Sequence, residues 1–235
     1  MLNNNLLALI FTFAVALAWL RLNDFAAARG WISSDLSRKV IHMGTGPLFV
    51  LCWLLFTDDA GARFLAALVP LAITAQFFLV GSGILHDESA VKAMSRTGDR
   101  REILRGPLYY GIAFVVLTIL FWTHTPTGMV ALMLMCGGDG LADILGRRMG
   151  NTKLPWSRNK SLSGSIAMFV GGFIFSWLIL GVYVAAGYFP GPWLSYLPVI
   201  LIISIAGTLV ESLPFKDIDN ITVTLTAVAL GYLLF

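Results

Sequence analysis

Long apolar runs separated by short polar segments extend over nearly the whole chain. A helix needs about 20 mostly apolar residues to cross the hydrocarbon core of a bilayer. By that measure the pattern predicts eight spans, at 6–22, 46–57, 64–85, 107–122, 127–145, 165–188, 194–213 and 221–235. The second run is short unless it begins near Val40, and the fifth run contains two aspartates. Seven spans are possible if one of these two runs is re-entrant. The sequence therefore predicts an all-α, polytopic transmembrane bundle.

Composition supports this class and excludes others. Of the 235 residues, 57% are hydrophobic and 12% are charged, whereas soluble domains average about 25% charged residues. This balance excludes a disordered chain, a disulfide-stapled secreted module and an ordinary soluble enzyme. The spans leave only short loops, so we expect a single integral-membrane domain over 1–235. Cys52 and Cys136 lie in apolar runs and are expected to be buried thiols rather than a disulfide or a metal pair.

The basic residues indicate an orientation. The loops after the first, third, fifth and seventh runs, with the helix ends beside them, carry 15 of the 16 lysines and arginines, and the remaining one is Arg63. Because basic loops stay on the cytoplasmic side, we expect these loops to face the cytoplasm and both termini to lie outside. The membrane is then a bacterial inner membrane or an organelle membrane. The alternative is that this asymmetry reflects insertion topology alone. The same face, however, also collects most of the polar residues that composition does not explain.

Two aspartates interrupt the fifth apolar run. Asp139 and Asp143 are four residues apart and share one helix face. A charge at membrane depth costs about 2.5–3.5 kcal/mol on insertion scales, and two carboxylates repel unless a cation lies between them. Mg²⁺ takes such oxygen ligands together with substrate phosphates, and Gly137, Gly138 and Gly140 would let a phosphate approach the backbone. The alternative is a salt bridge from Asp143 to Arg147, which leaves Asp139 unexplained.

A basic, serine-rich segment at 153–165 leads into the sixth run. A helix start rich in Ser and Gly offers free N–H groups and the positive end of a dipole. Lys160 adds a point charge and Arg158 a planar fork suited to phosphate oxygens. The segment is a candidate polyphosphate cradle, although it lacks the P-loop pattern. The alternative is a solvated basic loop with an ordinary serine N-cap.

Two further polar groups lie at helix ends. Arg38, Lys39 and His42 are spaced to face one site, with His42 as a proton carrier or a positioning residue; a structural histidine and two lipid-headgroup anchors are the alternative. Glu211 ends an apolar helix, where its charge opposes the helix dipole, so a partner or a metal is expected. Asp219 and Asn220 open the last helix, where N-capping is the simple alternative.

These motifs resemble the polyprenol kinase family, which includes dolichol kinase, phytol and farnesol kinases and CTP-dependent diacylglycerol kinase. The resemblance rests on RKVIHMGTGP, GDGLADILGRRMG, KLPWSRNKSLSGSIAMFVGG and ESLPFKDIDN, in this order from Arg38 onward. The short chain and compact loops look most like the phytol and farnesol kinase branch. The resemblance implies a Mg²⁺-dependent membrane kinase that takes the γ-phosphate of CTP, or of another nucleoside triphosphate, and transfers it to a prenol lipid such as phytol, farnesol, geranylgeraniol or dolichol at the cytoplasmic face. We expect membrane lipids but no nucleic acid as partners.

The resemblance also implies roles for residues. Asp139 and Asp143 would hold Mg²⁺ or orient the alcohol, and Glu211 would complete the metal site. The nucleotide phosphates would be held by Lys160, Ser161, Gly164 and Ser165, with Arg158 beside them. The same site would be bordered by Arg38, Lys39, His42, Asp219 and Asn220. Two other classes stay open: a CDP-linked nucleotidyl or phosphatidyl transferase, and a small ion or solute transporter whose acids line an ion path.

Overall fold

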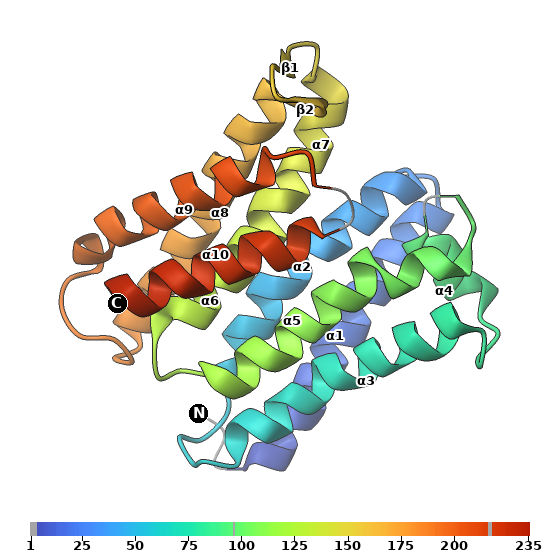
Figure 1. The fold of residues 1–235 in the computed structure, drawn as a ribbon. Helices are drawn as coiled ribbons and strands as arrows, with labels where there is room; N and C mark the ends of the chain where they lie inside the picture. The colour runs from blue at the N-terminus through green and yellow to red at the C-terminus, as the bar shows by residue number, and fades with distance from the viewer. Residues whose placement is uncertain (1–3, 96, 216–217) are drawn as a thin grey trace.

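The computed structural model describes residues 4–95, 97–215 and 218–235, and these are helical almost throughout (Figure 1). The first half contains α1 (Asn5–Ala28), α2 (Ser34–Trp53), α3 (Ala62–Ser82), α4 (Glu88–Met94), η1 (Arg100–Leu104) and α5 (Gly106–Leu120). The second half contains α6 (Pro126–Met133), η2 (Leu134–Gly138), α7 (Asp139–Met149), β1 (Lys153–Leu154), β2 (Ser157–Ser161), α8 (Leu162–Ala185), η3 (Trp193–Tyr196), α9 (Leu197–Glu211) and α10 (Asp219–Leu234). The predicted all-α membrane bundle is confirmed.

The number of spans is lower by length and composition than the eight predicted. Among the described residues, six helical stretches are long and apolar enough to cross a membrane: α1, α3, η1–α5, α6–α7, α8 and η3–α9. The second predicted run belongs to α2, which begins earlier, at Ser34, because the hydroxyl of Ser33 caps it by accepting from the N–H of Leu36. The charged first turns of α2 make it too polar to count, and α10 is too short.

One helical segment forms the centre of the bundle. Every residue from Met129 to Cys136 is at most 1% exposed, and α2, α5, α8 and α10 pack around this segment. Its sequence is apolar on every side, which is typical of a helix with no solvent-facing or lipid-facing stripe. η2 is a π-helical turn, and such turns widen a helix and occur often at functional sites. Here the turn leads directly into Asp139.

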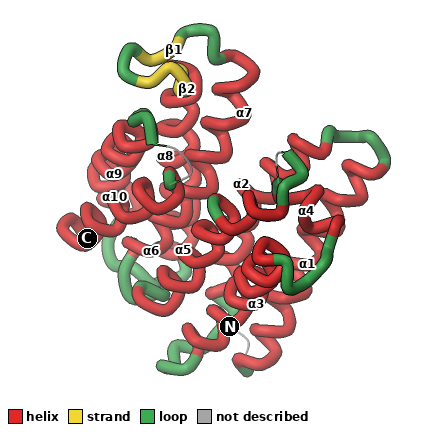
Figure 2. Tube along the Cα trace, turned by 45° about the vertical axis from the view of Figure 1, so that its right-hand side comes forward, coloured by secondary structure: helices red, strands yellow, loops and turns green. Residues whose placement is uncertain are grey.

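The two ends of the bundle differ in chemistry. At one end, Arg38 of α2 donates to the carbonyl of Ser95, and Asn220 of α10 donates to the carbonyl of Gly106. These bonds connect the beginnings of α2 and α10 to the segment between α3 and α5, which the basic-residue pattern assigned to the same face. Figure 2 shows where α2, α4, α5 and α10 lie along the tube. At the other end, the Asn5 amide donates to Thr57, and the ring of Phe235 lies 6.3 Å from that of Tyr196. Arg96 and Lys216, two of the basic residues in that pattern, lie outside the described residues.

A short β-hairpin interrupts the helices between α7 and α8. β1 and β2 are antiparallel, and Pro155 and Trp156 form the turn between them. The indole N–H of Trp156 lies 3.2 Å from both the carbonyl and the hydroxyl oxygen of Ser212, just after α9. The hairpin was not predicted from the sequence. It places Lys160, near the end of β2, against α9 and α10.

Candidate functional site

A cavity of about 880 Å³ opens at the end of the bundle that carries the basic loops. Residues from α2, α5, α7, β2, α8, α9 and α10 line it. The structure brings almost all of the predicted site residues to its wall: Arg38, Lys39, His42, Asp139, Asp143, Lys160, Ser161, Gly164, Ser165, Glu211, Asp219 and Asn220. Arg158 is the exception, because its side chain is exposed on the outer side of the hairpin and does not line the cavity.

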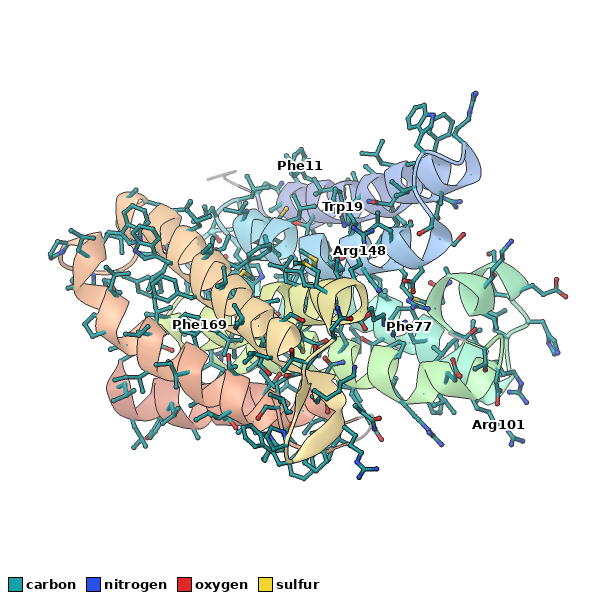
Figure 3. The ribbon with its side chains drawn as sticks, turned by 90° about the horizontal axis from the view of Figure 1, so that it is seen from above. Phe11, Trp19, Phe77, Arg101, Arg148 and Phe169 are labelled. Atoms are coloured by element: carbon teal, nitrogen blue, oxygen red, sulfur yellow. The ribbon has the colours of Figure 1, made fainter. Side chains whose placement is uncertain are left out.

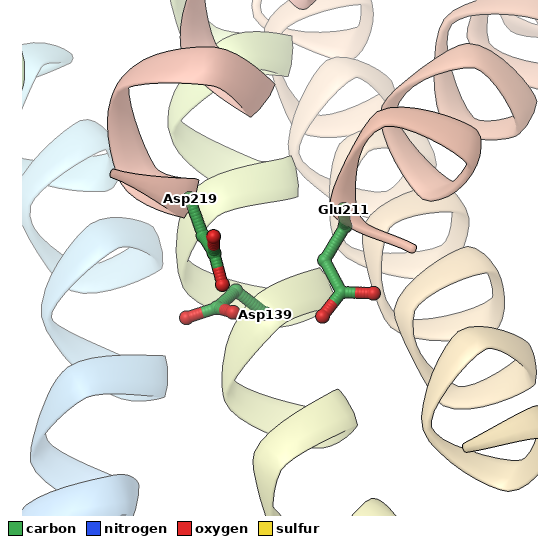
Figure 4. A group of neighbouring side chains, drawn as sticks. All are labelled: Asp139, Glu211 and Asp219. Carbon is green, nitrogen blue, oxygen red and sulfur yellow. The ribbon is translucent and has the colours of Figure 1, made fainter. Parts of the chain in front are cut away.

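Three carboxylates meet in the middle of this cavity. Asp139 is the first residue of α7, Glu211 is the last of α9 and Asp219 is the first of α10. One oxygen from each lies within 4.8 Å of the others, and the three side chains point toward one another (Figure 4). An all-oxygen donor set of this kind suits Mg²⁺.

Lys160 neutralises two of these acids. Its Nζ lies 2.5 Å from Glu211 Oε1 and 2.7 Å from Asp219 Oδ2. Burial of the ammonium opposes its charge, but the adjacent carboxylates of Glu211 and Asp219 outweigh this and raise the pKa of Lys160 above 10.5. Lys160 is therefore charged at neutral pH. The unfavourable position of Glu211 at the end of α9 is resolved by this partner.

Asp143 belongs to a different set of contacts. Its carboxylate pairs with Arg147 at 2.6 Å and with Lys39 at 3.5 Å. Lys39 is 8% exposed and also pairs with Asp35 at 2.8 Å. The helical spacing that suggested a shared metal site for Asp139 and Asp143 also allowed the Asp143–Arg147 pair, and the structure contains that pair. Asp219, for which N-capping was the simple alternative, lies next to Asp139 and Glu211.

His42 lies beside the acidic group, on α2. Its Nε2 is 3.2 Å from the carbonyl oxygen of Met135 and 3.6 Å from Asp139 Oδ2. Because a carbonyl can only accept, we assign the proton to Nε2, which leaves Nδ1 as the acceptor nitrogen. The ring of Tyr110 packs 4.4 Å from the imidazole, and its hydroxyl donates to the His42 carbonyl at 2.7 Å. Tyr110 thus holds the histidine in place.

The start of α8 combines a capped helix with unused polar atoms. Ser161 Oγ accepts from the N–H of Gly164 at 3.2 Å, so Ser161 is the N-cap. Within the described part of the chain, the buried Ser165 Oγ and Asn220 Oδ1 have no hydrogen-bond partner. Both residues line the cavity. Buried polar atoms without partners are costly, and a bound ligand would satisfy these two.

The glycines on either side of Asp139 do not all serve the role expected of them. A Cβ on Gly137 would lie 2.4 Å from the ring of Phe175, and one on Gly138 would lie 2.7 Å from the sulfur of Met168. Both glycines are buried against α8, so a phosphate does not reach them. The expectation of close phosphate approach is wrong for these two, because helix packing requires their small size. Gly140 does line the cavity.

Sequence reasoning missed one side of the cavity. Arg105 and Glu102 line it from η1 and the adjoining loop, and Tyr110 lines it from α5. The two charged residues lay in a basic loop without a recognisable spacing, and Tyr110 lay in an apolar run. Apolar and aromatic side chains also line the cavity, among them Ile41, Phe77, Met94, Pro107 and Tyr110. The cavity can therefore accept a molecule with an anionic or polar head and an apolar body.

Comparisons with known proteins agree with this chemistry. The chain is 43% identical over 230 residues to a probable phytol kinase 1, chloroplastic, of Oryza sativa subsp. japonica, and covers 73% of that protein. It is 43% identical over 212 residues to the farnesol kinase, chloroplastic, of Arabidopsis thaliana, and 41% identical over 209 residues to phytol kinase 1, chloroplastic, of the same plant. These alignments include 88% of this chain and cover 68% and 69% of the two relatives. No family model and no solved structure matches the chain.

Proposed function

The chain belongs to the family of phytol and farnesol kinases, and from this we propose that it transfers the γ-phosphate of a nucleoside triphosphate to the hydroxyl of a prenol lipid at the membrane. One observation carries the proposal: three carboxylates and the ammonium of Lys160 lie in a single cavity that apolar side chains also line. A prenol has a reactive hydroxyl on a hydrocarbon chain, and the charged and the apolar lining residues match these two parts.

The reaction follows from the placement of the charges. The oxygen of the prenol forms a bond to the γ-phosphorus, and the bond from that phosphorus to the nucleoside diphosphate breaks. The hydroxyl proton passes to the carboxylate of Asp139, which lies between His42 and the other two acids. Lys160, Arg38 and Lys39 line the same cavity and offset the charge of the phosphates. Catalysis of this kind rests mainly on alignment and on neutralisation of charge.

The three clustered carboxylates fit a divalent cation. Asp139, Glu211 and Asp219 would hold Mg²⁺, since one oxygen from each lies within 4.8 Å of the others and Mg²⁺ prefers oxygen ligands. When bound, Mg²⁺ neutralises the phosphate oxygens and orients the nucleotide. Asp143 pairs with Arg147 and Lys39 and so holds these two basic side chains at the edge of the cavity.

We further propose CTP as the donor and the cytoplasm as the side from which it enters. The donor rests on the resemblance to the polyprenol kinase family, which typically uses CTP and sometimes UTP. The side rests on the basic loops, which gather at the end of the bundle where the cavity opens.

One assay tests the proposal. Purified protein in detergent is given CTP, UTP or ATP labelled at the γ-phosphate, with phytol, farnesol, geranylgeraniol, dolichol or diacylglycerol as acceptor. We expect labelled prenyl phosphate with CTP preferred over ATP. Release of pyrophosphate or of a nucleoside monophosphate would instead identify a CDP-linked transferase. No transfer to any acceptor would refute a kinase, and a preference for ATP would refute the donor alone.

A further inference from the structure

A second, apolar groove lies next to the cavity. It lies between α1, α2, α3 and α5 and is walled by Thr12, Val15, Ala16, Trp19, Leu20, Ile41, Thr45, Leu48, Phe49, Cys52, Val69, Pro70, Ile73 and Phe114. Ile41 and Thr45 also line the polar cavity, so the two spaces share a wall. His42 lies between these two residues in the sequence, and its ring is 3.6 Å from Asp139.

The groove is apolar even where its residues are not. Thr12 Oγ1 donates to the carbonyl of Ala8, and Thr45 Oγ1 donates to that of Ile41. Both hydroxyls are thus used within their own helices, and no charged residue lines the groove among the described residues. Such a surface excludes a nucleotide and favours a hydrocarbon.

Trp19 forms the inner wall where α1 faces α2 (Figure 3). Its indole N–H lies 3.4 Å from the carbonyl of Ile41, and Gly44 provides the space for the ring, since a Cβ there would lie 2.3 Å from it. Phe11, on the same helix, is exposed at the outer surface of the bundle. α1 buries few of its residues against the bundle, so its remaining side chains face the bilayer beside the groove.

We propose that this groove holds the second isoprene unit of the alcohol substrate, an assignment that rests on the proposed kinase function. Its volume of about 80 Å³ is small beside the 880 Å³ of the cavity, so the groove holds a short segment and not the whole chain. The first isoprene unit then lies in the cavity next to Ile41 and Thr45, which line both spaces, and the chain beyond the groove extends into the bilayer along α1 and α3. The hydroxyl is thereby directed past His42 to Asp139.

Substitution at the groove tests this assignment. Ala16 is half-buried in the groove wall, whereas Ala18 is exposed on the opposite side of α1. In Ala16→Trp the indole fills the groove, and we expect the ratio of kcat/KM for phytol to kcat/KM for the five-carbon alcohol 3-methylbut-2-en-1-ol to fall at least tenfold. In the matched variant Ala18→Trp the ratio stays at the wild-type value. An unchanged ratio in a folded Ala16→Trp protein, or an equal loss for both alcohols, would overturn the assignment.

A labelling experiment separates this inference from the kinase reaction and from folding of the variant. A farnesol analogue with a diazirine on its second isoprene unit is photolysed with the wild-type protein in nanodiscs, and labelled peptides are identified by mass spectrometry. We expect label on residues 12–20, 45–52 and 69–73 and its loss in excess phytol. Label confined to α8, α9 or α10, or label that phytol does not displace, would overturn the groove. If labelling succeeds while no phosphate is transferred, only the kinase reaction fails.

Discussion

Asp139 differs from the other acids of the cavity in its surroundings. Glu211 and Asp219 both pair with Lys160, and Asp143 pairs with Arg147 and Lys39. Asp139 instead faces His42 at 3.6 Å and follows the π-helical turn. From its position beside His42, we propose that Asp139 accepts the proton of a hydroxyl that enters there.

We predict that Asp139→Asn lowers kcat by at least ~10²-fold, the lower end of what acid–base groups contribute. Asparagine keeps the size of the side chain but can neither take the proton nor carry the charge that holds a cation. The measurement is the transfer of labelled phosphate to farnesol. Asp58→Asn, an exposed carboxylate in the loop between α2 and α3 at the opposite end, is the matched control and should match the wild type. Near wild-type turnover in Asp139→Asn would disprove the role.

The contribution of Lys160 to stability can be separated from its contribution to activity. Removing one partner of a buried ion pair leaves the other charge uncompensated, which costs about 3 kcal/mol or more. Because the side chain of Glu211 is only 6% exposed, we predict that Lys160→Met lowers the thermal midpoint and abolishes activity. Adding Glu211→Gln should restore part of the midpoint but none of the activity. Lys153→Met, an exposed lysine that lines the same cavity, is the control for loss of charge alone.

The same pair predicts a pH dependence of stability. The pKa of Lys160 is raised in the folded protein, so its contribution is fully present below the unfolded value of about 10.4 and is lost as the pH rises through the folded pKa. The difference in thermal midpoint between wild type and Lys160→Met should therefore be constant from pH 7 to pH 9 and shrink above about pH 10.5. A difference that disappears already near neutral pH would contradict the assignment.

Among the elements, η2 and α8 make the contact that sets the position of Asp139. A Cβ on Gly171 of α8 would lie 2.4 Å from the carbonyl oxygen of Gly137, which is backbone and cannot move aside. A Cβ on the next residue, Gly172, would lie 3.1 Å from the side chain of Leu134, which can adjust. The glycines of α8 thus allow this helix to approach the turn before Asp139.

We predict that Gly171→Ala lowers stability by about 1–3 kcal/mol, the usual cost of overpacking, and reduces activity by displacing Asp139. Gly172→Ala should have a smaller effect on both. Thermal denaturation and phosphate transfer, measured on the two variants side by side, provide the test. Equal stability of the two proteins would show that η2 and α8 do not pack as described.

At the scale of the whole molecule, the two ends of the bundle differ in their chemistry. The cavity and the loops joined by Arg38, Lys160 and Asn220 lie at one end. At the other end, the ring centroids of Trp53 and Trp122 lie 4.9 Å apart and those of Trp177 and Trp193 lie 4.3 Å apart. Because basic loops stay on the cytoplasmic side, the orientation predicted from the lysines and arginines can be tested at both ends.

Cysteine labelling makes this test possible because Cys52 and Cys136 are buried. We predict that a membrane-impermeant maleimide labels Asp58→Cys in intact cells and labels Lys153→Cys only after the membrane is opened. Both positions are exposed loop or hairpin residues at opposite ends of the bundle. The reverse pattern would place the cavity on the outer side and exclude entry of a cytoplasmic nucleotide.

The sequence alone determined the class of the protein, the approximate helices and the residues gathered at one face. Runs of apolar residues must be helical in a bilayer because no water satisfies their backbone groups, and this constraint is local. The sequence also singled out Asp139, His42, Lys160 and Glu211 as candidate site residues.

Only the tertiary structure decided which partners meet. Spacing along a helix reports neighbours on that helix, so it linked Asp139 to Asp143 and Asp143 to Arg147 with equal force. The approach of Asp219 to Asp139 depends on α10 packing beside α6 and η2, and the contact of Lys160 with Glu211 depends on a hairpin tied to Ser212. These contacts join residues more than 50 positions apart, and no local pattern encodes them.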